Sequence, residues 1–390
     1  MNSIQIHSNR NNRPRLLFLG SGPIYPTSIP VRDKFAALSQ HFSGEIISPI
    51  IGNYDVEYLG DFQLYSYKYW RQSTILRNIY SFVSIIFMGI KSSVIRGQFD
   101  VIITTNPLMI GMAGYLLAKI VRSRLVVEIN GDFHSSLTVG SPESVKPMWI
   151  DRIKSGISKW FLIPTTTYGA DMVKLVYHKQ IAPLRLNEGR IRSVSFPNFV
   201  SIKRFSRRER RDDRYILSIG YPWYLKGMDV LINAFNRISH KFPHHRLKII
   251  GWCPEGREYF EQLASVNKRI DLLDAVQYEQ VIEYMTRCTL YVLASRTDSS
   301  PRVLREAMAS RKPIIASNID GVPDLITDGY NGLLFESENV LSLSESMEQL
   351  LSNNKLAQLF ANNGYSYVQK NLSEDVYIEN YQNLITAILE

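Results

Sequence analysis

The chain has 390 residues, of which 45% are hydrophobic and 21% are charged. This length and composition predict two globular domains with sizeable cores and exclude a mainly disordered or fibrous protein. The net charge of +9 is uneven: residues 1–200 have 22 Lys and Arg against 12 Asp and Glu (+10), and residues 201–390 have 23 against 24 (−1). The basic half favours an anionic partner, such as lipid head groups or phosphate-bearing substrates. No nucleic-acid recognition motif accompanies it, so nucleic acid is not an expected partner.

The spacing of cysteines and histidines argues against a disulfide framework or a metal site. Cys253 and Cys288 form no CxxC motif and the seven histidines form no HExxH motif, so we expect reduced cysteines, no metal and a cytoplasmic protein. The polar residues 1–14 predict a disordered tail rather than a secretory signal. Apolar runs at 79–90 and 108–118 are shorter than the ~20 residues of a spanning helix, and predict buried core helices.

The first half of the chain alternates between short apolar runs and stretches of helical periodicity. In chain order, these predict a strand at 15–20, a helix at 29–42, a strand at 45–51, a helix at 71–97, a strand at 100–105, a helix at 106–121 capped by Asn106 with Pro107 first, and a strand at 124–129. Such alternation is typical of a parallel sheet covered by helices. Residues 15–200 are therefore predicted to form a first Rossmann-like domain.

A proline and a dense charge run at 196–214 interrupt this pattern, and we interpret residues 201–212 as a linker between domains. The charge run suits a solvated linker; its alternative is a contact to anionic lipid. Alternation resumes in 213–373, with strands predicted at 215–220, 246–251, 290–295 and 312–317 and helices at 228–238, 279–286 and 301–309. A last helix, 374–390, has Ser373 as its N-cap. Two such domains would bind a ligand between the carboxyl ends of their sheets.

Two carboxylates lie eight positions apart in the segment TDSSPRVLREAM, at Asp298 and Glu306. Pro301 predicts a helix start between them, capped by Ser299 or Ser300. The free amides of the first helical turn, at 302 and 303, would suit a phosphate. Carboxylates on either side would accept hydrogen bonds from sugar hydroxyls. The spacing thus fits a nucleotide diphosphate sugar.

This region resembles the family 4 retaining glycosyltransferases of the GT-B fold. That family has an acid–seven residues–acid motif, usually with two Glu, followed by pieces seen here as EAMA, PIIA, GVPDLI and DGYNGLLF, up to Phe335. The segments 215–235 and 197–205 resemble the family's lysine–glycine segment and interdomain linker. The resemblance is dense over 195–370. It is looser over 15–195, where RLLFLGSG resembles the glycine loop of the acceptor-binding domain.

The resemblance implies a donor site in the second domain. Glu306 would bind the ribose hydroxyls and Asp298 would approach the sugar. The diphosphate would lie on the amides of Arg302 and Val303, beside Ser299 and Ser300. Lys226, which follows Gly220 in the donor segment, would neutralise the departing diphosphate. No metal or other cofactor would be required.

The resemblance also implies parts of the first domain's role. The loop Gly20–Ser21–Gly22 would close over donor phosphate or acceptor. Asp132 and His134, in the loop after the strand 124–129, are further candidate catalytic residues. The helix 374–390 would pack back on the first domain, which would bind a glycan or lipid-linked acceptor. The basic-flanked helix at 71–97 further suggests a peripheral contact with an anionic membrane at its cytoplasmic face.

The predicted function is therefore retaining, metal-independent sugar transfer in polysaccharide or glycolipid biosynthesis. Two departures from the family pattern keep other functions open. Position 298 is Asp where Glu is usual, and position 221 is Tyr where many members have arginine. These departures motivate a non-catalytic nucleotide- or glycan-binding subunit as one alternative. A GT-B epimerase that acts on the nucleotide sugar itself is the other.

Overall fold

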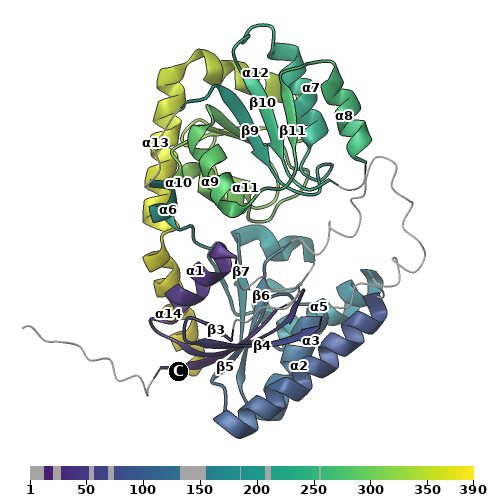
Figure 1. Ribbon diagram of the computed structural model, residues 1–390. Coiled ribbons are helices and arrows are strands. Elements are labelled where there is room, and N and C mark those ends of the chain that lie inside the picture. The colour runs from purple at the N-terminus through teal and green to yellow at the C-terminus, as the bar shows by residue number, and fades with distance from the viewer. Residues whose placement is uncertain are drawn as a thin grey trace, which may run out of the picture.

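The computed structural model describes residues 13–20, 28–51, 57–68, 74–131, 155–184, 186–206, 212–253 and 256–390. They form two α/β domains, one above the other in Figure 1. The α/β class and the two parallel sheets predicted from the sequence are confirmed.

The first domain is built on an eight-stranded sheet in the order β3-β4-β2-β1-β5-β6-β7-β8. All neighbouring strands are parallel except β3 and β4. The strands are β1 (Arg15–Leu19), β2 (Ser43–Ile50), β3 (Tyr58–Leu59), β4 (Phe62–Lys68), β5 (Val101–Thr104), β6 (Arg124–Ile129), β7 (Met172–Leu175) and β8 (Ser193–Ser195). The short apolar runs of the sequence fill its buried centre, and β1 and β5 are among the most completely buried strands.

Helices cover both faces of this sheet (Figure 1). One layer holds α2 (Thr74–Arg96), α3 (Met109–Val121), a π-helical turn η2 (Ser158–Leu162) and α5 (Ile163–Tyr168). The other holds α1 (Ile29–Leu38) and the C-terminal α14 (Glu374–Leu389). Two 3-10 helices, η3 (His178–Leu184) and η4 (Glu188–Arg190), lie between β7 and β8. Asn106 does not cap α3: its Oδ1 accepts a bond from the Leu108 amide at 2.9 Å, which forms a turn before the helix.

The second domain has a six-stranded parallel sheet in the order β11-β10-β9-β12-β13-β14. Its strands are β9 (Tyr215–Ile219), β10 (Arg246–Ile250), β11 (Ile270–Leu273), β12 (Leu290–Leu293), β13 (Ile314–Ser317) and β14 (Leu333–Phe335). Its helices are α7 (Met228–Ile238), α8 (Arg257–Ser265), α9 (Tyr278–Arg287), α10 (Arg302–Ala309), α11 (Val322–Leu325), α12 (Val340–Ser352) and α13 (Asn354–Asn371). Two apolar cores lie on the two faces of this sheet.

The chain crosses between the domains twice, through α6 (Ile202–Ser206) and through the junction of α13 and α14. The amide of Val200 donates to the Leu372 carbonyl at 3.1 Å, so the two crossings are bonded to each other. The Ser373 side chain caps α14 by accepting from the Val376 amide. In the first domain, Tyr381 of α14 is buried and donates to the Glu128 carboxylate. The two crossings between the domains are therefore tied together by a backbone hydrogen bond, and α14 is anchored in the first domain by a side-chain bond.

One expectation about the core is wrong. The apolar run 79–90 is predicted to be buried, but α2 exposes Ile79, Val83 and Phe87, each more than half accessible. The helix contacts α3 and the sheet with its other side. The prediction fails because hydropathy alone does not say which face of a helix meets the core.

Candidate active site

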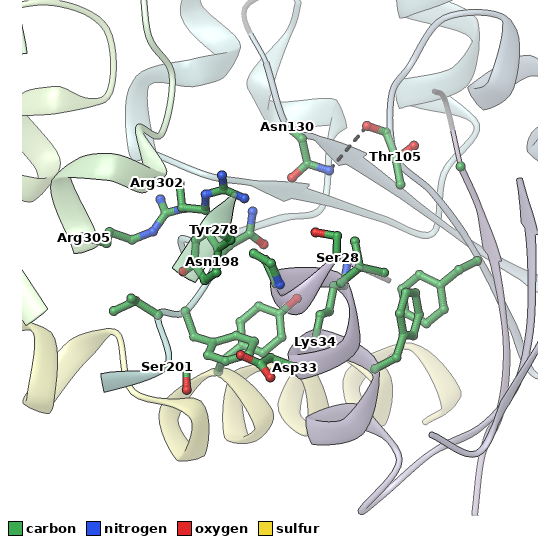
Figure 2. Close-up of a pocket in the computed structure, with 18 of the residues that line it drawn as sticks. Ser28, Asp33, Lys34, Thr105, Asn130, Asn198, Ser201, Tyr278, Arg302 and Arg305 are labelled. Atoms are coloured by element: carbon green, nitrogen blue, oxygen red, sulfur yellow. Dashed lines mark hydrogen bonds between the residues drawn. The ribbon is translucent and has the colours of Figure 1, made fainter. Parts of the chain in front are cut away.

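A cavity of about 510 Å³ lies between the two domains. Its wall in the first domain comes from α1 and from the carboxyl ends of β1, β5 and β6. Its wall in the second comes from Tyr278 and from the start of α10. Figure 2 shows Arg302, Arg305 and Tyr278 grouped on one side, and Ser28, which precedes α1, with Asp33 and Lys34 of α1 at the other. This is the place where ligands bind in open α/β sheets, beyond the carboxyl ends of the strands.

Glu306 is the buried carboxylate of this cavity, with a side chain that is 0% exposed. Its Oε1 accepts a 2.9 Å bond from the Tyr278 hydroxyl and lies 3.2 Å from Nε of Arg302. Its Oε2 has no partner among the described residues. Burial raises the pKa of Glu306 above its usual value, against the opposing effects of Arg302, the Tyr278 hydroxyl and Arg305. A buried acceptor left open at a cavity suits a ligand that brings hydroxyl donors.

Arg305 lies beside Glu306 and is 3% exposed. Its Nη1 donates to the carbonyl oxygen of Ser300 at 3.1 Å and to its hydroxyl at 2.6 Å. Its Nε is unpaired among the described residues. Burial lowers the pKa of Arg305 to about 10, although Glu306 opposes this shift. The guanidinium therefore places a positive charge next to the cavity wall, where an anionic ligand would meet it.

The start of α10 differs from the prediction. Pro301, in an extended conformation, is the N-cap, and the helix begins at Arg302 without a side-chain cap. Neither predicted serine caps it, because Ser300 bonds Arg305 and Ser299 is buried against Gly321. A Cβ at Gly321 would lie 2.0 Å from the Ser299 carbonyl oxygen, so only glycine fits there. The uncapped first turn leaves amides available to a phosphate.

Val303, in the same first turn, is half-buried and packs on the apolar core below the helix. Its side chain thus holds the turn against the domain. A backbone amide, rather than this side chain, is what the residue can offer to a ligand.

Lys226 and Asp298 form an ion pair of 2.5 Å between Nζ and Oδ2, with side chains 20% and 14% exposed. The stem of Lys226 lies over Gly220, where a Cβ would meet it at 2.8 Å. Asp320 accepts bonds from the Asp298 amide and the Thr297 hydroxyl, both at 2.8 Å, and so fixes the loop. Gly227 precedes α7 with a φ of 61°, and its backbone packs closely against the carbonyl oxygen of Ala294. Lys226 and Asp298 are therefore held next to each other by the loops that precede α7 and α10.

The first-domain wall includes Gly20, Thr105 and Asn130. A Cβ at Gly20 would lie 2.2 Å from the Ser48 hydroxyl, so the residue must be small where β1 ends. Asn130 donates to Glu128 at 2.9 Å and to the Thr105 carbonyl at 3.4 Å (Figure 2). Four predicted residues, Ser21, Gly22, Asp132 and His134, lie outside the described residues.

A buried cluster of charged side chains, centred on Glu128, supports the first-domain wall of the cavity. Glu128 is 1% exposed and lies 3.8 Å from Nζ of Lys174 and 3.9 Å from Nζ of Lys34. Burial alone would raise the pKa of Glu128, but Lys174, Lys34, Tyr381 and Asn130 lower it to about 2. The carboxylate is thus ionised, and it links the C-terminal helix to the floor of the cavity.

The structure brings Glu306, Arg302 and Gly20 to one cavity. Lys226 and Asp298 pair with each other and do not appear in its lining. Sequence reasoning did not assign Tyr278 or Arg305. No spacing rule singles out Arg305 as a partner of Glu306, because adjacent residues on a helix do not face each other. Among the described residues, no group of three His, Cys, Asp or Glu is arranged to hold a metal ion.

Comparison with known proteins identifies similar sequences for part of the chain. Residues 200–367 match the family described as glycosyl transferases group 1. An uncharacterized glycosyltransferase of Methanocaldococcus jannaschii is 34% identical over 149 residues, which cover 37% of this chain and 40% of that protein. Another, from Haemophilus influenzae, is 31% identical over 169 residues, covering 42% and 46%. The chain thus matches less than half the length of these curated relatives.

A third relative is a capsular polysaccharide biosynthesis glycosyltransferase of Staphylococcus aureus, 23% identical over 168 residues, which cover 42% of this chain and 44% of that protein. Among solved structures, sucrose-phosphate synthase from Thermosynechococcus elongatus superposes with a TM-score of 0.78 at 17% identity, covering 96% of this chain and 100% of that one. Anabaena HepE in complex with UDP and glucose gives 0.69 at 13%, with the same coverage. This likeness shows the GT-B fold, which confirms the fold predicted from the sequence.

Proposed function

We propose that this protein is a retaining glycosyltransferase that moves a sugar from a nucleotide diphosphate sugar to a hydroxyl of a glycan or lipid-linked acceptor, without a metal. The observation that carries the proposal is the burial of Glu306 at the cavity. This residue is a fully buried carboxylate on the family's motif, with one oxygen unpartnered among the described residues at a cavity between two domains. Ribose hydroxyls would satisfy this oxygen by donating to it.

The donor would extend from Glu306 across the start of α10. Its diphosphate would lie on the amides of the first turn and near the Arg305 guanidinium, which favour negative charge. Lys226 would stabilise the charge that develops on the leaving diphosphate. Asp298 orients Lys226 by their 2.5 Å pair and would meet hydroxyls of the sugar.

The acceptor would enter from the first domain, along α1 and the ends of β5 and β6. As the bond from the sugar's anomeric carbon to the phosphate oxygen breaks, the acceptor oxygen bonds to the same face of that carbon. The acceptor's proton passes to the departing phosphate, so the products are a nucleoside diphosphate and a glycoside of unchanged configuration. The chain's residues supply positioning and charge stabilisation.

Similar proteins support the substrate class. HepE was crystallised with UDP and glucose, and the S. aureus relative is named for capsular polysaccharide biosynthesis. We extend both to this chain: a nucleotide diphosphate sugar as donor, and a role in polysaccharide or glycolipid biosynthesis. Cys253 and Cys288 are buried and unbonded to each other, which fits the reducing cytoplasm.

The proposal is tested by following donor sugars with and without a lipid or glycan extract as acceptor, in the presence of EDTA. We expect acceptor-dependent release of nucleoside diphosphate that EDTA does not abolish. Proton NMR of the product should show the anomeric configuration of the donor. Turnover that needs added metal, an inverted product, or conversion of donor alone into another nucleotide sugar would each contradict the proposal.

A further inference from the structure

Helix α2 distributes its side chains in the opposite way to an ordinary surface helix, with its large apolar residues facing outward. Its buried stripe is mostly small or polar: Ser81, Ile85, Gly89 and Ser92. Its exposed stripe is large and apolar: Leu76 (54% exposed), Ile79 (53%), Val83 (58%) and Phe87 (66%). Gly89 lies on the inner side in close contact with α3, where a Cβ would lie 2.4 Å from the end of the Leu117 side chain, which would have to shift. The helix is thus built to lie on the domain while it presents apolar side chains outward.

Two neighbouring elements extend this surface. α3 packs against both α2 and η2, and α2, α3 and α5 lie on the same side of the first domain (Figure 1). α3 exposes Leu116 and Ile120, and the turn before α5 exposes Trp160 (76%) and Phe161 (59%). We call the following residues the apolar face: Leu76, Ile79, Tyr80, Val83, Phe87, Leu116, Ile120, Ile157, Trp160 and Phe161. Several large exposed side chains on adjacent elements mark an interaction site.

The charges on these elements have one sign. Residues 74–96, 109–121 and 155–168 contain no Asp or Glu, and they carry Arg77, Lys91, Arg96, Lys119 and Lys159. A partner must therefore be apolar at its centre and negative around it. A second copy of this surface would bring cations against cations, which disfavours self-association through it.

A hollow of about 320 Å³ beside the face points to the same chemistry. Its apolar lining comes from Tyr65, Phe87, Met88 and Ile95, and Lys91 and Arg96 lie in its wall. An apolar hollow next to two cations would suit a lipid, whose acyl chain is attached to an anionic head group. Trp160 fits too, because tryptophan favours the boundary between hydrocarbon and water.

We propose that the apolar face binds this protein peripherally to an anionic lipid bilayer, with α2 lying in the plane of the interface. By length and composition alone, Leu76–Arg96 is apolar enough to cross a membrane. Its inner stripe, however, packs on α3 and on β2. Combined apolar and basic contacts give stable peripheral binding where either alone is weak. Only the further step, that the acceptor is lipid-linked, rests on the proposed function.

The test is flotation of the full chain with vesicles of phosphatidylcholine, either pure or containing 30% phosphatidylglycerol as the anionic lipid. We expect binding to the anionic vesicles at 50 mM NaCl, weaker binding at 500 mM, and little binding to the neutral ones. Val83→Ser with Phe87→Ser, and Trp160→Ser with Phe161→Ser, should each weaken binding at least tenfold. Lys91→Gln should weaken it about fivefold, the effect of one cation near an anionic surface.

The matched control is Val266→Ser with Leu359→Ser, which alters exposed apolar residues of the second domain (76% and 53% exposed) and should bind as the unmodified chain does. All variants change exposed side chains, so unchanged melting temperatures verify folding. Absence of flotation at 50 mM salt, or equal flotation of all variants, would overturn the proposal. A dimer in light scattering that the face variants dissociate would assign the surface to a second copy instead. Flotation needs no donor, so it can succeed even if the proposed transfer reaction fails.

Discussion

The Tyr278 hydroxyl donates a 2.9 Å hydrogen bond to Oε1 of Glu306, and Oε2 of the same carboxylate has no partner among the described residues. Tyr278 begins α9 and Glu306 lies in α10, so the bond joins two helices at the cavity edge. It holds one carboxylate oxygen in place and leaves the other for a ligand. The buried charge is costly without that ligand, which is a common property of binding sites.

Nucleotide affinity should depend on pH through Glu306. The ionised carboxylate is the form that accepts ribose hydroxyls, and burial raises its pKa. Affinity should therefore be full above this pKa and fall on acidification, at a higher pH than for an ordinary carboxyl group. Because the Tyr278 bond lowers the pKa of Glu306, Tyr278→Phe should move the midpoint upward.

Calorimetric titration with nucleoside diphosphate between pH 4.5 and 8 measures this dependence. Tyr330→Phe, at an exposed tyrosine of the same domain, is the control and should leave the midpoint in place. A midpoint that Tyr278→Phe leaves unchanged would mean that another group controls binding.

Lys226→Met should reduce kcat by about 10²–10³ while changing nucleotide affinity less, because the lysine acts mainly on charge that develops on the leaving group. The matched control is Lys241→Met. Lys241 pairs with Glu348 at 2.7 Å on the surface of the same domain, so its loss should change kcat by less than about twofold. Steady-state kinetics with a fixed acceptor measures both. A kcat within tenfold of the unmodified enzyme for Lys226→Met would remove this residue from the mechanism.

Ser300→Ala should lower the free energy of unfolding by about 1–3 kcal/mol, because the buried Arg305 guanidinium loses its 2.6 Å hydroxyl acceptor. Ser265→Ala removes an exposed hydroxyl bonded to the Gln262 carbonyl, and should cost less than about 0.5 kcal/mol. Urea unfolding of the variants compares them. Equal stability of the two would show that Arg305 does not depend on Ser300.

Glu128 should make the first domain sensitive to acid. Its folded pKa of about 2 lies below the ordinary 4.5, so its contribution is present above pH 4.5 and is lost as the pH falls toward 2. The difference corresponds to about 3 kcal/mol at most. The Tyr381 bond helps to lower this pKa, so Tyr381→Phe should bring acid unfolding to a higher pH. Circular dichroism during acid titration, with Tyr58→Phe as the exposed control, measures the shift; coincident curves would contradict the assignment.

Much of the fold follows from local patterns in the sequence. α7 occupies Met228–Ile238, the range predicted from its periodicity, and α14 begins after the capping serine. Less predictable were features set by tertiary contacts. α2 buries Ser81 and Ser92 and exposes Phe87 because its inner side packs on α3, a contact that no pattern within the helix reveals.

The site was predictable where it rests on a motif. The spacing and context of Glu306 predict a ligand-binding carboxylate, and the structure buries this residue at the cavity. The residues that surround it come from distant segments: Tyr278 is 28 positions away, and α1 belongs to the other domain. The serine cap failed because Ser300, which precedes the helix, has a competing partner in Arg305 of the first helical turn. Hydrogen-bond competition of this kind is decided by three-dimensional geometry.

The most direct test of the account is thermal unfolding with millimolar UDP, GDP, ADP, CMP or dTDP, for the unmodified chain and for Glu306→Ala. A nucleotide at about 100 times its dissociation constant stabilises the folded state by about 2.7 kcal/mol, which is readily detected. We predict that at least one nucleoside diphosphate raises the melting temperature and that Glu306→Ala abolishes the shift. No shift with any nucleotide, or an equal shift in Glu306→Ala, would contradict a donor site at this carboxylate.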